Sequence, residues 1–233
     1  QSWGQIWLRR QWKEFYQWYL ENQELQFESI HIPEAIKRWG NSSWLKYHTV
    51  YCHLKQKYFV YPYKSLTTCF AEAGEHAKFS DNIGQVTLYS ENQNYIFARC
   101  EDDAVKYDIF YERMDMERYL NSKEGNKRIC IDLYGDKYCY DNATHLLTTK
   151  QLESVVPEQS FALRLKPHEM NVICQMEGDD IYLYNICGIA FEDKRIKKCM
   201  WKKWEYFAAP KMTSDFNMML LYLKKLIRKH FVR

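Results

Sequence analysis

Apolar residues recur at helical spacing in the opening segment, residues 1–22. They lie three or four positions apart and predict a helix with one broad apolar face, made of Leu8, Trp12, Phe15, Tyr16 and Tyr19. Ser2 and Gln5 have the spacing of a capping box, which predicts that this helix begins near Ser2. Gly4 weakens the first turn and would let another backbone approach closely.

Two more helices are predicted before residue 56. Pro33 favours the start of a short helix over residues 33–39, and Gly40 favours its end. Ser42 or Ser43 would cap the third helix. One side of that helix would carry Trp44, Tyr47, His48, Tyr51 and Leu54. A strand over residues 58–62, "YFVYP", is expected next.

The pattern changes near residue 84, where short runs rich in β-branched and aromatic residues alternate with polar turns. These runs predict strands within 85–89, 94–98, 106–112, 128–135, 144–149, 161–166 and 181–186. A helix is predicted near residues 114–121, and "EGDD" has the composition of a hairpin-type turn before the last strand. The tail, residues 213–233, has the spacing of an amphipathic helix.

We therefore expect an α+β protein in two parts. Residues 1–83 would form a helical segment, and residues 84–233 a strand-rich domain that ends in the amphipathic helix. The boundary rests on the change of pattern alone, because no linker or internal repeat marks it.

Composition changes this picture mainly through the aromatic residues. The 233 residues include 8 Trp, 19 Tyr and 12 Phe, and such rings either pack a core or stack on sugars and bases. The net charge of +3 is too small for a dedicated nucleic-acid protein, so no nucleic-acid partner is expected. The small net charge also argues against a function as a single-stranded nucleic-acid binder that uses Tyr and Lys.

Three further features bear on where the protein works. The eight cysteines show no CxxC spacing, which favours reduced thiols in a cytoplasmic protein. No run of 18 apolar residues predicts a membrane span. The chain begins with Gln1 and shows no signal-peptide pattern, so we expect a fragment or a processed product.

The loop "SLTTCFAEAGEHAKF", residues 65–79, carries the clearest candidate chemistry. Glu72, Glu75 and His76 are competent ligands for a divalent cation, and Gly74 would let the backbone approach a phosphate or a sugar closely. The residues alone leave three interpretations: a metal or phosphate site, an acceptor-binding loop, or an ordinary turn.

Two stretches of residues 1–80 resemble bacterial glycosyltransferases of the family-2-like, GT-A type. "SWGQIWLRRQW" is similar to a Ser-Trp-Gly segment that follows the nucleotide-sugar half in that family. "SSWLKYHTVYCHLKQKYFVYPYKSLTTCFAEAGEHA" has the family's Ser-Trp, helix, strand and loop, and Gly-x-His in the same order.

The resemblance implies a transferase that moves a sugar from a nucleotide-sugar donor to a polysaccharide or lipid-linked glycan. It makes His76 the histidine that helps bind the metal (Mn or Mg) and the donor diphosphate. It places Trp3 and Gly4 beside donor sugar and acceptor. The further candidates for substrate binding are Trp7, Trp44, Tyr47 and Gly74.

The sequence departs from the family in two places. The family commonly has an Asp beside the Ser-Trp as catalytic base, whereas Ser42 and Leu45 stand there, so Glu72 and Glu75 become the candidate bases. No Asp-x-Asp is present, and the nucleotide-binding half would lie upstream of Gln1, so this chain alone should be inactive.

Alternatives stay open in the second part. Asp108, Asp132, His168 and Glu169 are its most site-like residues, although carboxylates that accept nearby backbone N–H groups are the commoner case. The basic tail helix could lie on an anionic membrane or pack on its own domain. A non-catalytic module that binds a glycan or a protein is the alternative function.

Overall fold

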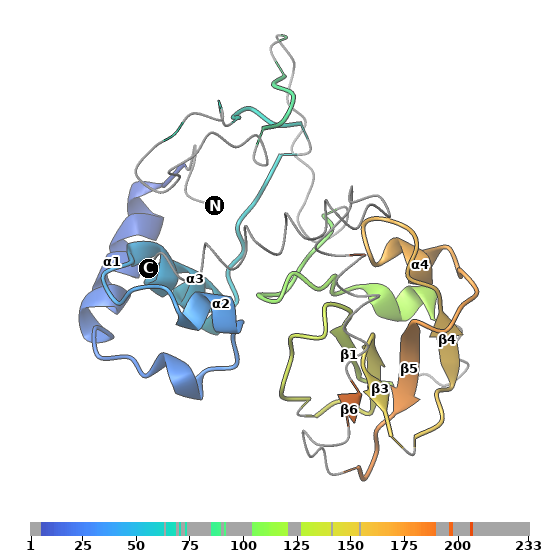
Figure 1. Cartoon of the computed structure of the whole chain (residues 1–233). Helices are drawn as coiled ribbons and strands as arrows, with labels where there is room; N and C mark the ends of the chain where they lie inside the picture. Colours follow the sequence, from blue (N-terminus) through green and yellow to red (C-terminus); the bar gives the residue numbers. More distant parts are fainter. Residues whose placement is uncertain are drawn as a thin grey trace. The chain divides into compact units, whose positions relative to one another are not determined.

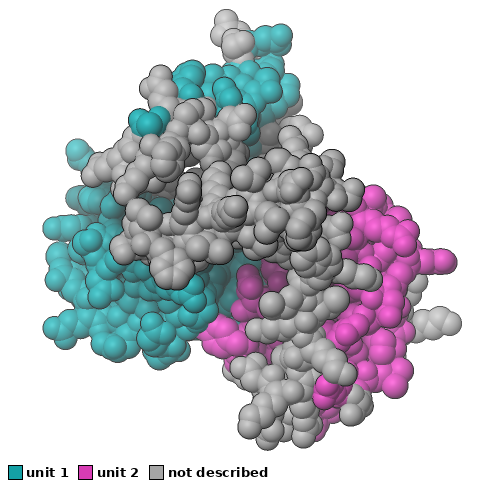
Figure 2. Space-filling model, in the orientation of Figure 1, with its two compact units in different colours: residues 1–111 teal, residues 112–233 magenta. Residues whose placement is uncertain are grey.

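The computed structural model shows a mixed helix-and-sheet protein, which confirms the α+β class (Figure 1). It describes residues 6–62, 64–68, 70, 73, 85–89, 91, 104–120, 127–140, 142–153, 155–189, 196–197 and 206. The chain divides into two compact units, Gln1–Tyr111 and Glu112–Arg233, coloured separately in Figure 2. The change of sequence pattern at residue 83 therefore falls inside unit 1. Among the described residues, no helix combines the length and apolarity that a membrane span requires.

The first helix of unit 1, α1, spans Arg9–Glu21, so the predicted start near Ser2 is wrong. Residues 6–8 are not helical, and Leu8 has a ψ of 142°. The Gln11 side-chain oxygen accepts the backbone N–H of Leu8 at 3.3 Å. This bond satisfies a backbone donor at the start of the helix, so Gln11 takes the capping role that the sequence had assigned to Gln5.

The other two predicted helices of unit 1 are confirmed. A 3₁₀ turn (η1, Phe27–Ser29) leads to α2 (Glu34–Lys37), which Pro33 precedes. The Ser43 hydroxyl caps α3 (Trp44–Leu54) by accepting the N–H of Lys46 at 3.4 Å. Ser43 rather than Ser42 is therefore the cap.

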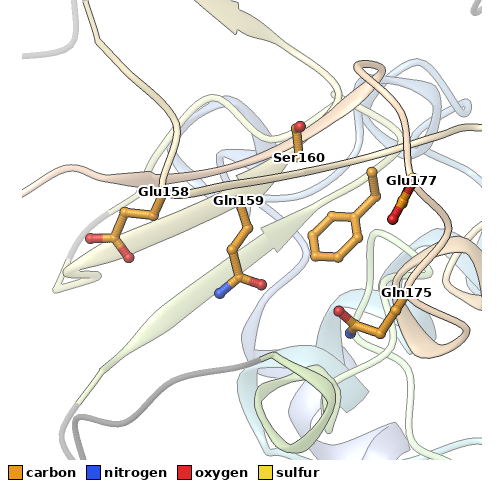
Figure 3. A pocket seen from close by; sticks show the side chains of 6 residues that line it. Glu158, Gln159, Ser160, Gln175 and Glu177 are labelled. Atoms are coloured by element: carbon orange, nitrogen blue, oxygen red, sulfur yellow. The ribbon is translucent and has the colours of Figure 1, made fainter.

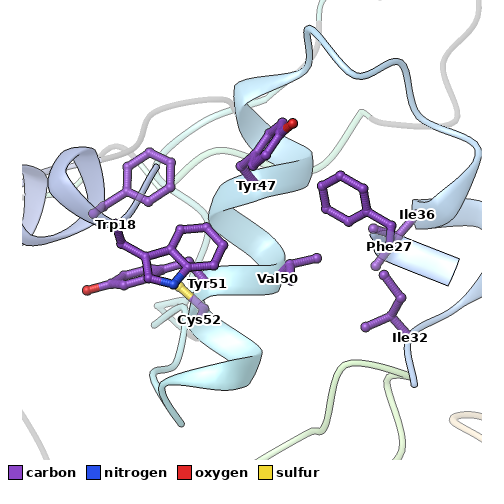
Figure 4. Close-up of a cluster of buried hydrophobic side chains, with 9 residues drawn as sticks. Trp18, Phe27, Ile32, Ile36, Tyr47, Val50, Tyr51 and Cys52 are labelled. Atoms are coloured by element: carbon purple, nitrogen blue, oxygen red, sulfur yellow. The ribbon is translucent and has the colours of Figure 1, made fainter. Parts of the chain in front are cut away.

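The core of unit 1 is built mostly from rings. Figure 4 shows side chains of α1, α3 and the η1–α2 segment that point toward one another. Its buried members are Phe15, Trp18, Phe27, Ile32, Ile36, Tyr47, Val50, Tyr51 and Cys52. The apolar side predicted for α3 is only partly right, because Trp44 and Leu54 are exposed while Val50 and Cys52 are buried.

Unit 2 is organised around a four-stranded sheet in the order β1-β2-β5-β4 (Figure 1). Its strands are β1 (Ile129–Asp132), β2 (His145–Thr148), β4 (Gln159–Phe161) and β5 (Ile181–Asn185). β1 and β2 are parallel, whereas β5 runs antiparallel to both β2 and β4. A second antiparallel pair joins β3 (Gln151–Leu152) and β6 (Ile196–Lys197).

The two faces of this sheet pack into different clusters, as the period-2 alternation of strand side chains requires. On β5, Ile181 and Leu183 join a cluster with η2 (Met116–Tyr119) and α4 (Met170–Ile173). Tyr182 and Tyr184, which alternate with them, pack on the opposite face with Leu146 of β2. The sheet is therefore covered on both faces.

Only part of the predicted strand set is confirmed. The runs at 128–135, 144–149 and 181–186 contain β1, β2 and β5. The runs at 58–62 and 85–89 form no strand, and only Phe161 of the run at 161–166 belongs to one. The run at 106–112 has a single bridge residue, Tyr107. "EGDD" does bend before β5, but it links that strand to α4 rather than forming a tight hairpin.

Candidate functional site

Four rings of unit 1 lie together and form what we call the aromatic corner: Trp7, Trp12, Trp44 and His48. The Trp7 ring centroid lies 5.3 Å from that of Trp12, at an interplanar angle of 81°. Trp7 also lies 6.2 Å from Trp44 and 4.2 Å from His48, again between ring centroids. Trp7 is thus the centre of the corner.

Short-range signals place these four rings. Trp7 lies in the non-helical segment before α1, and Trp12 lies in the first turn of that helix. Trp44 is the first residue of α3, directly after the Ser43 cap, and His48 follows one turn later. The spacing of four residues puts Trp44 and His48 on one side of α3, so both can face Trp7.

A buried ammonium fixes the chain just before α3. Lys46 is 3% exposed, and its Nζ donates to the backbone oxygens of Lys37 and Trp39 at 2.8 and 2.9 Å. The same Nζ donates to the Asn41 side chain at 3.3 Å and lies 4.1 Å from the centroid of the Phe27 ring. These contacts tie the α2–α3 connection to the core and so hold Trp44 in place.

The corner offers ring surface to solvent. Trp12 is 45% exposed and Trp44 is 43% exposed, whereas Trp7 is half-buried between them. Large rings in a protein usually bury most of their area, since each removes much apolar surface from water. Two exposed indoles that are braced by a third therefore form a surface suited to a flat, partly apolar ligand such as a sugar ring.

His48 adds a neutral ring to the corner. Burial lowers the pKa of His48 to about 4, and burial also raises the pKa of the neighbouring Cys52 thiol to about 11. Both groups are therefore uncharged at pH 7, with Cys52 Sγ 3.5 Å from His48 Nε2. Within the described part of the chain, His48 Nδ1 is buried and has no hydrogen-bond partner. A histidine with so low a pKa is a weak base, so we assign it a packing and contact role.

The structure brings together two of the residues that the resemblance had pointed to, Trp7 and Trp44. Tyr47, the third described one, is a core residue: it is 4% exposed, and its hydroxyl donates to the Gln23 backbone oxygen at 2.9 Å. The remaining candidates lie outside the described residues and stay predictions: Trp3, Gly4, Glu72, Gly74, Glu75 and His76. Sequence reasoning missed Trp12 and His48 as site residues, although their helical spacing had placed them on apolar faces.

The site-like residues of the second part have structural partners. Asp108 accepts the N–H of Phe110 at 2.8 Å, and Asp132 accepts the N–H of Lys137 at 2.9 Å. His168 lies between two carboxylates, with Nε2 3.2 Å from Glu112 Oε2 and Nδ1 3.6 Å from Glu169 Oε2. Glu112, which the sequence did not single out, also accepts the N–H of Tyr134 at 2.7 Å. Burial raises the pKa of the Glu112 carboxyl.

These buried groups do not amount to a metal centre. Among the residues that the structure describes, no three His, Cys, Asp or Glu side chains come together as metal ligands. The cation predicted from the resemblance would use His76, which lies outside them. Its fit is therefore not tested by the geometry of the described residues.

A shallow depression of about 540 Å³ lies beside β4 in unit 2 (Figure 3). Its lining is mostly polar: Glu158, Gln159, Ser160, Phe161, Gln175 and Glu177. Two of these groups already have partners, because Glu158 binds Lys127 at 2.8 Å and Gln175 donates to the Tyr119 backbone oxygen at 2.6 Å. We therefore rank the aromatic corner above it as a site.

Comparison with known proteins adds no further assignment. No family model, no curated protein and no solved structure matches this chain.

Proposed function

We propose that this chain is the C-terminal part of a glycosyltransferase and that unit 1 supplies its acceptor-binding surface. The observation that supports this is the aromatic corner, in which Trp12 and Trp44 expose their rings against a braced Trp7. An indole face is apolar and carries partial negative charge, so it attracts the polarised C–H groups on one face of a pyranose.

In this proposal the reaction moves a sugar from a nucleotide donor to a polysaccharide or a lipid-linked glycan. The aromatic corner orients the acceptor, and Glu72 or Glu75 removes the proton of the attacking hydroxyl. His76 contacts the donor diphosphate and its Mn or Mg ion, which would neutralise the leaving group. An upstream nucleotide-binding half would complete the enzyme, and the basic tail, for which the sequence predicts an amphipathic helix, would keep it at the cytoplasmic face of a membrane.

The experiment uses the full-length protein with its nucleotide-binding half. Trp44→Ala is expected to raise the acceptor KM about two- to tenfold, the equivalent of the roughly 0.5–1.5 kcal/mol that an aromatic contact contributes. The donor KM should stay unchanged, because the corner contacts the acceptor only. His76→Ala should lower kcat instead.

Trp39→Ala is the matched control. Trp39 is also an exposed tryptophan close to α3, at 39% exposure, but it takes no part in the aromatic corner. Its replacement should leave both KM values unchanged. Equal effects of Trp39→Ala and Trp44→Ala would contradict the proposal, as would a full-length protein with no transfer activity.

A non-catalytic glycan-binding module is the second candidate. It would use the same aromatic corner but needs neither a base nor a metal, and the presence of Ser42 and Leu45 where the family has an Asp favours it. Glycan binding that is lost in Trp44→Ala, without any transfer in the full-length protein, would identify this second function.

A further inference from the structure

One face of α1 combines rings and cations next to the aromatic corner. Arg9, Trp12, Lys13 and Tyr16 lie at i, i+3, i+4 and i+7, so they share one side of the helix. All four are exposed, Trp12 at 45% and Tyr16 at 47%. The buried face of the same helix is formed by Phe15 and Trp18. We call the exposed set the basic aromatic face.

The two rings of this face are arranged as a pair. The centroids of Trp12 and Tyr16 lie 5.9 Å apart, and their planes differ by only 14°. Tyr19, the next ring along the helix, is partly buried and packs on the core instead, 5.0 Å from Tyr47 between ring centroids. The spacing of Trp12 and Tyr16 is close to the repeat of successive sugars in an extended glycan chain. A linear oligosaccharide could therefore contact successive rings, rather than a single one.

The charges beside the rings are not balanced. Within the described residues, neither Arg9 nor Lys13 has an ion-pair partner. The nearest acid along the helix, Glu14, is engaged elsewhere: it binds Lys57 at 3.0 Å and Arg10 at 3.8 Å. No acidic residue occupies the first turn of α1. In the part of the chain that the structure describes, the two cations that flank Trp12 are therefore not neutralised by an acid.

We propose that the basic aromatic face binds an acidic glycan, one with carboxylate groups on its sugars. The rings contact the C–H faces of successive sugars, and Arg9 and Lys13 donate charge-assisted hydrogen bonds to the carboxylates. This inference rests on the proposed glycan-binding role of unit 1 and adds the charge class of the glycan. A neutral glycan would use the rings but leave both cations unpaired.

The test measures binding of the whole chain to two hexasaccharides by calorimetry, oligogalacturonate as the acidic probe and cellohexaose as the neutral one. The wild type should bind the acidic probe at least tenfold more tightly at low salt, since charge-assisted bonds to two cations are lost with the neutral one. The preference should shrink as salt is raised.

Three variants separate the contributions of the rings and the cations. Arg9→Gln with Lys13→Gln should remove the preference for the acidic probe and leave cellohexaose binding within about twofold. Trp12→Ala should weaken binding of both probes. Arg10→Gln is the matched control, because Arg10 belongs to the same helix but pairs with Glu14. It should behave as the wild type. Unchanged far-UV circular dichroism checks the fold of each variant.

The possible failures are distinguishable. Equal binding of both hexasaccharides, unaffected by the double Gln variant, would overturn this inference and leave the proposed function standing. Binding of neither hexasaccharide would count against both. The inference would also be overturned if a dT oligonucleotide or anionic phosphatidylglycerol vesicles bound as tightly as oligogalacturonate and lost binding in the same variants. The partner would then be a nucleic acid or a membrane rather than a glycan.

Discussion

The two units differ in the side chains that form their cores and in the partners of their buried polar groups. Unit 1 packs rings on rings, and two of its buried side chains donate to backbone oxygens, Tyr47 to Gln23 and Lys46 to Lys37. Unit 2 has a mostly aliphatic core around its sheet. Its buried charges are paired side chain to side chain, as in Asp132 with Lys150 at 2.8 Å.

This difference predicts where each unit is sensitive. A backbone oxygen remains in place after most substitutions, so mutation of a side chain cannot remove the Lys37 and Trp39 partners of Lys46 and can remove only its Asn41 contact. A buried carboxylate that neutralises a buried ammonium can be removed, and the remaining charge is then uncompensated. Unit 2 should therefore tolerate single polar substitutions less well than unit 1.

The largest effect is expected for Asp132→Asn in unit 2. Asp132 is fully buried and binds Lys150, the Tyr140 hydroxyl and the Lys137 N–H. Loss of its charge leaves the Lys150 ammonium without a carboxylate and should lower the free energy of unfolding by about 3–5 kcal/mol. Hydrogen exchange of amides in β2 and β5 measures this for unit 2 alone.

The matched control for Asp132→Asn is Glu14→Gln in unit 1, which removes one partner of a solvent-exposed pair, Lys57–Glu14 at 3.0 Å. Water screens that pair, so the midpoint of urea unfolding should hardly move. Similar losses in the two variants would contradict the comparison.

A smaller effect is expected for Gly178→Ala, which tests how tightly the sheet of unit 2 is packed. A Cβ at this position would lie 2.6 Å from both Cα and Cβ of Ala162, so the backbone must shift. Overpacking of this kind costs about 1–3 kcal/mol. Gly40→Ala in unit 1 is the control, because its nearest atom is Ser42 Oγ at 3.9 Å. Urea unfolding of both variants should show a loss for Gly178→Ala only.

The last effect concerns pH and is expected in unit 1. The pKa of His48 is about 4 in the folded protein against 6.5 for an ordinary histidine. The unfolded chain therefore binds a proton that the folded chain does not, between about pH 6.5 and pH 4, so stability should fall as the pH is lowered through that range. His48→Phe should flatten this dependence when urea unfolding is followed by tryptophan fluorescence between pH 7.5 and pH 4.5. An identical pH dependence in wild type and variant would show that His48 is not responsible.

Local signals in the sequence were sufficient for the helices of unit 1. Ser43 and Pro33 are recognised as helix-start residues from their immediate neighbours in the sequence, so α2 and α3 could be predicted. The start of α1 could not be, because Gln5 and Gln11 both have capping chemistry and only the folded chain selects Gln11. The burial of Lys46 depends on carbonyl oxygens seven and nine residues away, which no local pattern encodes.

The strands show more clearly what local sequence patterns cannot predict. The runs at 58–62 and 85–89 have the same β-branched and aromatic composition as β5, yet they form no strand. A strand needs a partner for its backbone, and β-propensity mostly reports fit to a half-buried surface. Of the candidate site, Trp7 and Trp44 were named from the sequence as candidates, but their proximity, like the roles of Trp12 and Glu112, required distances between segments.

The position of β2 in the sheet has a consequence for how the protein emerges from the ribosome. β2 pairs with β1, which precedes it by a short crossover, and with β5, which is synthesised much later. Until residue 185 has left the exit tunnel, one backbone edge of β2 lacks its partner and is open to pairing with other nascent chains. The described helices of unit 1 can pack on one another once α3 is complete, and Phe59 and Ile109 add to their core later. Co-translational folding should therefore proceed in two stages: the helices of unit 1 pack first, at a time when the sheet of unit 2 still lacks β5.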